Sequence, residues 1–173
     1  METTALASVV RDVLRASAST VAIAESTCGG LVSYLVGDTI DAGQLVRAGV
    51  VVYSNDAKRD LARVPPETLT AHGAVSTEVA LALARGVRAY WDADWGIAET
   101  GIAGPIGQRR SRKSAGVAIL AIVGRPHGTD GPVIEVTQNV TSGLDNRIAN
   151  KRAFAHALLR FFAEVLARTP NTS

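Results

Sequence analysis

The sequence is poor in cysteine and in long apolar runs. The 173-residue chain contains one cysteine, Cys28, which excludes a disulfide within the chain and is compatible with a reducing compartment. Residues 1–7 lack a basic region followed by a long apolar run, so we expect no secretory signal. The longest apolar stretch, 115–123, is too short to cross a membrane as a helix. These absences predict a cytoplasmic protein with no membrane partner.

Motifs for metal binding and for the common serine-hydrolase triad are also missing. There is no cluster of cysteine and histidine and no His-Glu-x-x-His, so we predict no metal site. There is no Gly-x-Ser-x-Gly elbow, which argues against the triad of the α/β-hydrolases. The three histidines, His72, His127 and His156, fall in a predicted loop, a predicted hairpin turn and the predicted last helix. We interpret each as a surface or capping residue rather than as a base.

The chain does contain enough apolar material for a core. Hydrophobic residues make up 47% of the sequence and charged residues 20%, which excludes a disordered chain. The formal net charge of +2 does not indicate a nucleic-acid binder, although a mild basic excess favours anionic ligands. With no internal repeat and no linker, the length fits one domain over residues 1–173.

Hydrophobic periodicity predicts helices that alternate with strands. A capping serine, Ser76, with Glu78 in the following turn predicts the start of one helix. The strand that begins at residue 46 is nearly all apolar after Arg47, so we expect it to be central in the sheet. The other expected helices cover 6–14, 31–36, 56–62 and 154–165, and the expected strands cover 20–25, 46–53, 95–100, 117–123 and 133–140.

The connections between these strands predict how they pair. Helical segments separate the first three strands, which favours parallel pairing, whereas only residues 124–132 join the last two, which suits an antiparallel hairpin. The predicted fold class is therefore α/β, a single domain with three layers of helix, sheet and helix. Its sheet is expected to be mixed, mostly parallel and made of about five strands.

A serine follows the first predicted strand. Ser26 comes directly after the strand and is followed by Gly29, Gly30 and a predicted helix. The glycines allow the backbone to approach a ligand closely, and the helix is expected to aim its free N–H groups at that ligand. A nucleophile with an oxyanion hole needs these parts. The alternative is an ordinary strand-to-helix turn in which Ser26 caps the helix.

Lys58 is the candidate base for this serine. It lies shortly after the second predicted strand, in the segment 53–58. If the first two strands are parallel neighbours, their carboxyl ends share one sheet edge, where open α/β sheets bind ligands. A partly desolvated lysine acts as a base once its pKa falls toward neutrality. The alternative is a solvated lysine on a helix.

A third loop, 100–105, is expected on the same edge. Thr100 and the glycines after it can present hydroxyl and N–H donors to a phosphate or carboxylate, although the alternative is a plain turn. The spacing matches neither a Walker A loop nor a dinucleotide fingerprint. The basic segment 108–114 is predicted to be a solvated surface loop. The alternative is that it binds a phosphate near the site.

Four short segments occur together in this sequence. They are Ala24-Glu25-Ser26 with Gly29-Gly30, Tyr53-Ser54-Asn55 with Lys58, Gly73-Ala74-Val75-Ser76, and Thr100-Gly101-Ile102-Ala103-Gly104-Pro105. In order and spacing, these segments resemble the CinA C-terminal domain family, the family of competence/damage-inducible proteins and nicotinamide mononucleotide amidases. The resemblance runs from the first helix to about residue 123, and more loosely to the C-terminal helix.

The resemblance implies a function. It implies that nicotinamide mononucleotide, a small-molecule substrate, is deamidated to nicotinate mononucleotide and ammonia by a Ser–Lys mechanism without a cofactor, often in a homodimer. It implies Ser26 as the nucleophile, Lys58 as the base and Tyr53 as an assisting residue. The residues that it implies for substrate binding are Thr27, Gly29, Gly30, Thr100, Gly101, Ala103 and Gly104.

Departures from the family pattern leave alternatives open. Thr27 and Cys28 are exchanged relative to the usual Cys-Thr, residues 113–116 replace the usual Lys-Pro-Val-Gly, and 145–147 replace the usual Gly-Asp-Arg. These changes bear on the substrate more than on the fold. One alternative is a catalytically silent module with the same fold that binds a nucleotide or anion. A hydrolase that uses Cys28 is a weaker alternative, because the sequence places no histidine beside that residue.

Overall fold

The computed structural model describes residues 1–104 and 114–169, which form five strands and seven helices. The strands are β1 (Val21–Glu25), β2 (Val46–Val51), β3 (Trp95–Ile102), β4 (Val117–Gly124) and β5 (Ile134–Thr141). The helices are α1 (Thr3–Ala16), α2 (Leu31–Gly37), α3 (Ala42–Leu45), α4 (Asn55–Ala62), α5 (Pro66–His72), α6 (Thr77–Tyr90) and α7 (Arg147–Arg168). No described helix is long and apolar enough to cross a membrane.

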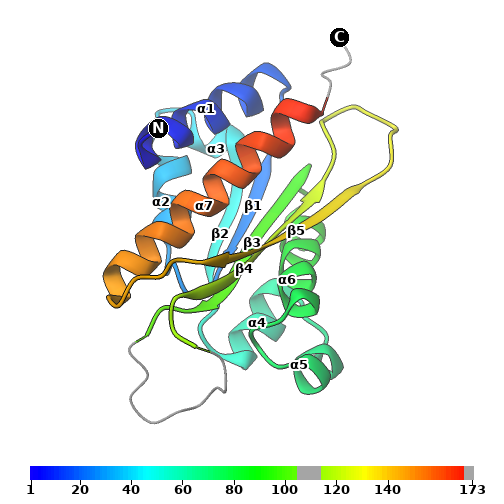
Figure 1. Cartoon of the computed structure of the whole chain (residues 1–173). Helices are drawn as coiled ribbons and strands as arrows, with labels where there is room; N and C mark the ends of the chain where they lie inside the picture. The colour runs from blue at the N-terminus through cyan, green and yellow to red at the C-terminus, as the bar shows by residue number, and fades with distance from the viewer. Residues whose placement is uncertain (105–113, 170–173) are drawn as a thin grey trace.

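The strands form one mixed sheet in the order β2-β1-β3-β4-β5. β1 pairs in parallel with β2 and β3, while β3–β4 and β4–β5 are antiparallel pairs. Only β4 therefore runs against the other strands, which confirms the predicted mixed, mostly parallel sheet with three parallel strands and a closing hairpin. The carboxyl ends of β2, β1 and β3 meet at one edge of the sheet (Figure 1).

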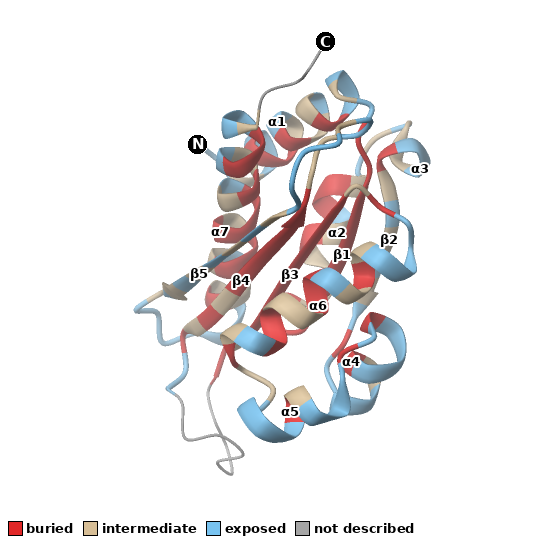
Figure 2. Ribbon diagram, turned by 90° about the vertical axis from the view of Figure 1, so that its right-hand side faces the viewer, coloured by how far each residue is buried: buried red, intermediate tan, exposed pale blue. Residues whose placement is uncertain are grey.

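Helices cover both faces of the sheet and give the three predicted layers (Figures 1 and 2). Successive β1 residues alternate between the two cores: Ile23 packs with α1 and α7, and Ala24 packs with α6. In the first core, the rings of Trp95 and Phe162 meet edge to face with centroids 5.7 Å apart. The two cores clamp β1 and β3, so the loops at the carboxyl ends of these strands stand on a rigid base.

β2 is an edge strand, and the prediction that it is central was wrong. Its residues alternate between half-buried and exposed, and it pairs only with β1. The run is apolar because its half-buried residues still pack on the cores: Val46 packs against the first core and Val50 against the second. Composition does not reveal that a strand lacks a second neighbour, so an apolar edge strand and a central strand look alike in sequence.

Polar caps set where several helices begin. Ser76 accepts the Val79 N–H at 3.2 Å, which confirms it as the cap of α6. The helix predicted over 56–62 does end at Ala62, before Pro65 and Pro66. The predicted loop position of His72 was wrong, because Pro66 starts α5 and His72 ends it. Proline is tolerated in the first turn of a helix because the N–H it lacks has no helical partner there. Of the predicted basic loop 108–114, all but residue 114 lies outside the described residues.

Candidate active site

The structure brings Ser26 and Lys58 together. Glu25 at the end of β1 is level with Val51 at the end of β2, so the two chains leave the sheet side by side. Ser54 caps α4 by accepting the Ala57 N–H at 3.0 Å, which starts this helix right after the strand. Lys58 reaches back from α4, and its Nζ lies 3.1 Å from Ser26 Oγ.

Lys58 is not the solvated lysine of the alternative interpretation. Its side chain is 1% exposed, and its Nζ also donates to the Val52 carbonyl at 2.6 Å and approaches the Tyr53 carbonyl at 3.4 Å. Burial lowers the pKa of Lys58, and the negative charge of Glu99 offsets only part of that effect. A neutral amine has two N–H donors for the two carbonyls and one lone pair for the Ser26 hydroxyl. The geometry thus suits a base.

Glu99, in the middle of β3, is a site residue that the sequence interpretation missed. Its side chain is fully buried, and its Oε1 accepts the N–H groups of Thr27 and Cys28 at 2.5 and 2.6 Å. Burial raises the pKa of Glu99 to about 7, although these hydrogen bonds oppose the shift. The available signal was a single acidic residue inside an otherwise apolar strand, and the same signal marks Glu25 in β1.

The N-terminus of α2 is closed by the protein itself. The Glu25 carboxylate accepts N–H groups from Gly30, Val32 and Ser33 at 2.8–3.0 Å, together with the Ser33 hydroxyl at 2.6 Å. The expectation that this helix aims free N–H groups at a ligand was therefore wrong for these residues. Because the N–H groups of 27–28 face Glu99, Gly29 has the only main-chain N–H of the turn without a partner among the described residues.

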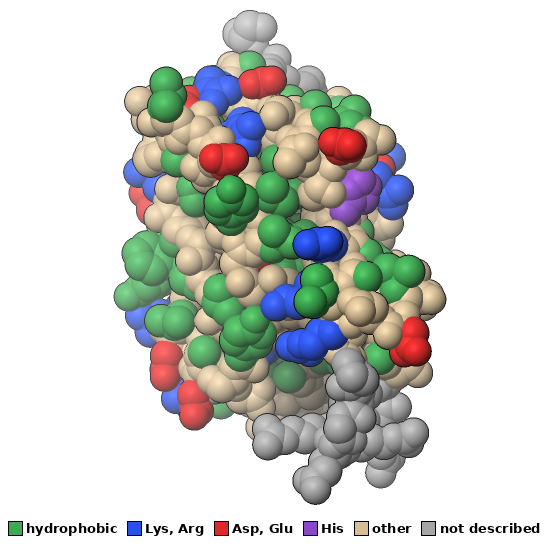
Figure 3. Space-filling model, turned by 90° about the vertical axis from the view of Figure 1, so that its left-hand side faces the viewer, with side chains coloured by type: hydrophobic (Ala, Val, Ile, Leu, Met, Phe, Trp, Pro, Cys, Tyr) green, Lys and Arg blue, Asp and Glu red, His purple; other side chains and the backbone are tan. Residues whose placement is uncertain are grey.

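Tyr53 and Lys151 converge on Gly29. Lys151 Nζ lies 3.4 Å from Tyr53 Oη, and a Cβ on Gly29 would collide with that oxygen and sit 2.9 Å from the ammonium nitrogen. Gly29 has a φ of +69°, which a side chain would also strain. Lys151 belongs to α7 and was not predicted. Lys and Arg side chains lie close together on this face of the molecule (Figure 3).

The loop after β3 is anchored more than it is exposed. The Thr100 hydroxyl, which is fully buried, donates to the Ala74 carbonyl at 2.7 Å. The Ala103 carbonyl accepts Asn150 Nδ2 at 2.8 Å, and Gly101 packs too closely on β4 to carry a Cβ. Gly104, with a φ of +64°, is the last residue described before 114. These contacts hold the loop in place near Ser26, and the Thr100 hydroxyl points into the protein.

The structure weakens the cysteine alternative, and the three histidines contact residues outside the serine turn: Thr3 for His156, Glu78 for His72 and Asp94 for His127. Burial, with the charges of Glu99 and Glu25, raises the pKa of the Cys28 thiol far above its usual range, so the thiolate is not available. Cys28 Sγ contacts the Lys151 carbonyl at 3.6 Å. Among the described residues, no group of three or more His, Cys, Asp and Glu side chains could hold a metal ion.

Comparisons with known proteins identify the family of this chain. The CinA C-terminal domain model matches residues 3–166. A CinA-like protein of Chlorobium phaeovibrioides is 40% identical over 164 residues, 95% of this chain but only 38% of the relative. A CinA-like protein of Prochlorococcus marinus is 41% identical over 130 residues, 75% of this chain and 30% of the relative. This chain thus spans well under half the length of these relatives.

Solved structures extend the match to the whole described fold. The competence/damage inducible protein CihA of Agrobacterium tumefaciens superposes with a TM-score of 0.83 at 31% identity, covering 97% of both chains. The competence damage-inducible protein A of Klebsiella pneumoniae gives a TM-score of 0.84 at 27% identity, covering 97% of this chain and 99% of its own. The family model and the solved structures therefore agree, and the chain belongs to the CinA C-terminal domain family.

Proposed function

We propose that the protein is an amidohydrolase that converts nicotinamide mononucleotide to nicotinate mononucleotide and ammonia. The observation that carries this proposal is the 3.1 Å contact between Ser26 Oγ and the buried Lys58 Nζ. A serine hydroxyl is a weak nucleophile unless a neighbouring base takes its proton. Burial supplies that base by lowering the pKa of Lys58, while the Val52 carbonyl fixes the position of its amine.

In the proposed acylation half-reaction, Ser26 attacks and Lys58 carries the proton. Lys58 accepts the Ser26 proton as Oγ attacks the carboxamide carbon, which gives a tetrahedral intermediate. Lys58 then returns that proton to the amide nitrogen, the C–N bond breaks and ammonia leaves. The product of this half-reaction is an ester between Ser26 and the nicotinoyl group of the nucleotide.

Deacylation repeats the proton transfers with water. Lys58 takes a proton from a water molecule that attacks the ester carbonyl, and gives it to Ser26 Oγ as the C–O bond breaks. Nicotinate mononucleotide is released and the amine is restored. One lysine therefore serves both half-reactions, and no external redox partner or cofactor is needed.

The turn around Gly29 is the proposed oxyanion site. The Gly29 N–H is the one main-chain donor of the turn that has no partner within 1–104 and 114–169, and the Tyr53 hydroxyl lies next to Gly29. One such donor contributes about 3 kcal/mol of transition-state stabilisation. Lys151, next to Tyr53, adds a positive charge that suits the substrate phosphate. Thr27, Gly30 and Thr100 then act mainly by shaping this surface, since the N–H groups of the first two and the Thr100 hydroxyl are bonded within the protein. Gly101, Ala103 and Gly104 stay candidate binding residues of the loop beside it.

A silent binding module with the same fold is the second candidate. The observation that favours it is the internal pairing of the turn: Thr27, Cys28 and Gly30 all donate to carboxylates, which leaves few donors for an oxyanion. Lys151 would bind an anionic nucleotide equally well in either case. The homodimer is likewise a proposal, carried over from the family.

Ammonia release distinguishes the two candidates. The purified protein is incubated with nicotinamide mononucleotide, and ammonia and nicotinate mononucleotide are measured together. The amidohydrolase proposal requires both products in equal amounts. A protein that binds the nucleotide, as judged by calorimetry, and releases no ammonia from any pyridine nucleotide amide is the binding module instead. Nicotinamide riboside, which lacks the phosphate, serves as the matched substrate control.

A further inference from the structure

Glu99 is a buried carboxyl group to which the proposed reaction gives no role. It lies directly opposite Glu25 in the parallel register of β1 and β3, and its side chain is fully buried. Its Oε1 accepts two N–H groups of the serine turn, whereas its Oε2 has no hydrogen-bond partner within 1–104 and 114–169. A buried carboxyl oxygen without a partner is unfavourable for folding, and so points to a use other than stability.

The first consequence of this arrangement is a fixed turn. The Ser26 N–H donates to the Glu99 carbonyl at 3.2 Å, and the next two N–H groups of the turn donate to the Glu99 carboxyl group. One residue therefore holds three consecutive N–H groups. The direction of the Ser26 hydroxyl toward Lys58 depends on these bonds, because a nucleophile must be held within about 0.5 Å of its productive position.

The second consequence is a charge that can switch. The charged groups that interact with Glu99 are Glu25 from β1 and Lys58 from α4, and the Cys28 thiol beside it stays neutral. Burial raises the pKa of Glu99 to about 7, so its charge changes near neutral pH. An ionised Glu99 favours the Lys58 ammonium, and a protonated Glu99 favours the free amine.

We propose that Glu99 is a positioning residue that holds the 26–28 turn on β3 and places a titratable negative charge beside the Ser26–Lys58 pair. Its kinetic consequences rest on the proposed amidohydrolase function. Glu99 does not contact the substrate and exchanges no proton with it. It acts through Ser26, whose hydroxyl it aims, and through Lys58, for which it sets the pH range over which the amine is a free base.

Glu99→Gln tests the charge, since the amide oxygen can keep both hydrogen bonds of the turn. Losing the charge should move the acidic limb of the kcat/KM profile for nicotinamide mononucleotide to lower pH. The ratio of variant to wild type should therefore be larger near pH ~6 than near pH ~9. Glu135→Gln removes an exposed carboxylate from β5 and should leave that ratio constant. A Glu99→Gln profile parallel to that of the wild type overturns the proposal.

Glu99→Asp tests the positioning. It keeps the charge but shortens the side chain by one methylene, which pulls the carboxyl group away from the N–H groups of the turn. We expect kcat to fall about 10–100-fold with KM little changed, because misplacing a reacting group by about 1 Å has effects of that size. The acidic limb should stay near that of the wild type. Wild-type kcat in Glu99→Asp would contradict the positioning role.

A readout without turnover separates this inference from the proposed function. The side-chain NMR signal of isotope-labelled Lys58 is followed against pH in the wild type and in Glu99→Gln. The midpoint should be lower in the variant whether or not the nucleotide is hydrolysed. Equal midpoints overturn the coupling even if the enzyme is active. A shifted midpoint in a protein that releases no ammonia overturns the proposed function and leaves the link between Glu99 and Lys58 intact.

Discussion

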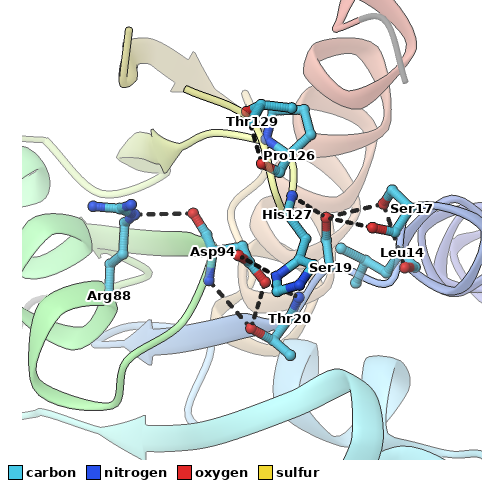
Figure 4. A network of polar contacts seen from close by, with 9 residues as sticks. All are labelled: Leu14, Ser17, Ser19, Thr20, Arg88, Asp94, Pro126, His127 and Thr129. Carbon is cyan, nitrogen blue, oxygen red and sulfur yellow. Dashed lines mark hydrogen bonds and ion pairs between the residues drawn. The ribbon is translucent and has the colours of Figure 1, made fainter. Parts of the chain in front are cut away.

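The two ends of the sheet carry similar residue types and use them differently. At the carboxyl end, Ser26 lies 3.1 Å from a fully buried lysine. At the amino end, Ser19, Asp94 and His127 form a network that joins β1, β3 and the β4–β5 connection (Figure 4). His127 Nδ1 lies 3.1 Å from Asp94 Oδ1, but Ser19 Oγ accepts the main-chain N–H of His127 at 2.9 Å and not its ring.

The difference shows that a serine, an acid and a base close together do not by themselves form an active site. At the amino end the side chain of His127 is 60% exposed. No base among the described residues points at the Ser19 hydroxyl, which contacts Ser17. Asp94 also accepts the N–H and hydroxyl of Thr20 at 2.8 Å, so the network ties chain segments together. Burial and the direction of each donor, rather than residue type, separate the candidate active site from a structural clasp.

Lys58→Met should break the carboxyl end most strongly. We expect kcat for ammonia release to fall about 10²–10⁴-fold, the usual contribution of a general base, with the fold retained. The double variant with Ser26→Ala should be little worse than either single one, since the pair acts as a unit. Lys151→Met is the matched control, and because that lysine is proposed to bind the phosphate, it should raise KM more than it lowers kcat. Steady-state kinetics would count against the base if Lys58→Met kept wild-type kcat.

Glu99→Gln should change how stability depends on pH. The pKa of Glu99 is about 7 in the fold against 4.5 ordinarily, so between these values the folded state holds a proton that the unfolded chain has released. Its contribution is full below pH 4.5 and is lost as pH rises through about 7. The variant should therefore lose less stability than the wild type between pH ~5 and ~8, by on the order of 3 kcal/mol. Urea unfolding at both pH values, with Glu135→Gln as the control, measures this difference, and identical pH dependence would refute it.

His127→Ala should have the smallest effect and completes the comparison. The pair with Asp94 is largely exposed, so its loss should lower the free energy of unfolding by less than ~1 kcal/mol. Turnover should stay within about 2-fold of the wild type, since the network lies at the opposite end of the sheet from Ser26. A large loss of turnover in a folded His127→Ala variant would show that the amino end takes part in the chemistry.

Much of the fold could be predicted because its signals are local. Periodicity, caps and connection lengths indicated the strands, the parallel pairing and the final hairpin, and parallel pairing in turn predicted that Ser26 and Lys58 share an edge. α5 was missed because a proline pair marks a helix start as readily as a break. The edge position of β2 was missed because pairing partners are not encoded in the composition of one strand.

The remaining site residues could not be predicted because they arrive from distant segments. Glu99 meets the Ser26 turn only through the register of β1 with β3, and Lys151 meets Tyr53 only because α7 packs across the sheet. The pairing of the α2 N-terminus with Glu25 was open to sequence reasoning in principle, since an acidic residue before a helix favours such a cap. Without the strand register, however, the sequence does not decide whether the N–H groups of α2 bind the Glu25 carboxylate or an anionic ligand.

The most direct test of the central claim is ammonia release from nicotinamide mononucleotide by Ser26→Ala and Cys28→Ser, measured side by side with the wild type. The account predicts that Ser26→Ala releases no ammonia above the uncatalysed rate while remaining folded, because only the attacking oxygen is lost. Cys28→Ser should retain substantial turnover, because the buried thiol is neutral and takes no part in the attack. Wild-type turnover in Ser26→Ala together with an inactive Cys28→Ser would contradict the assignment of Ser26 as the nucleophile.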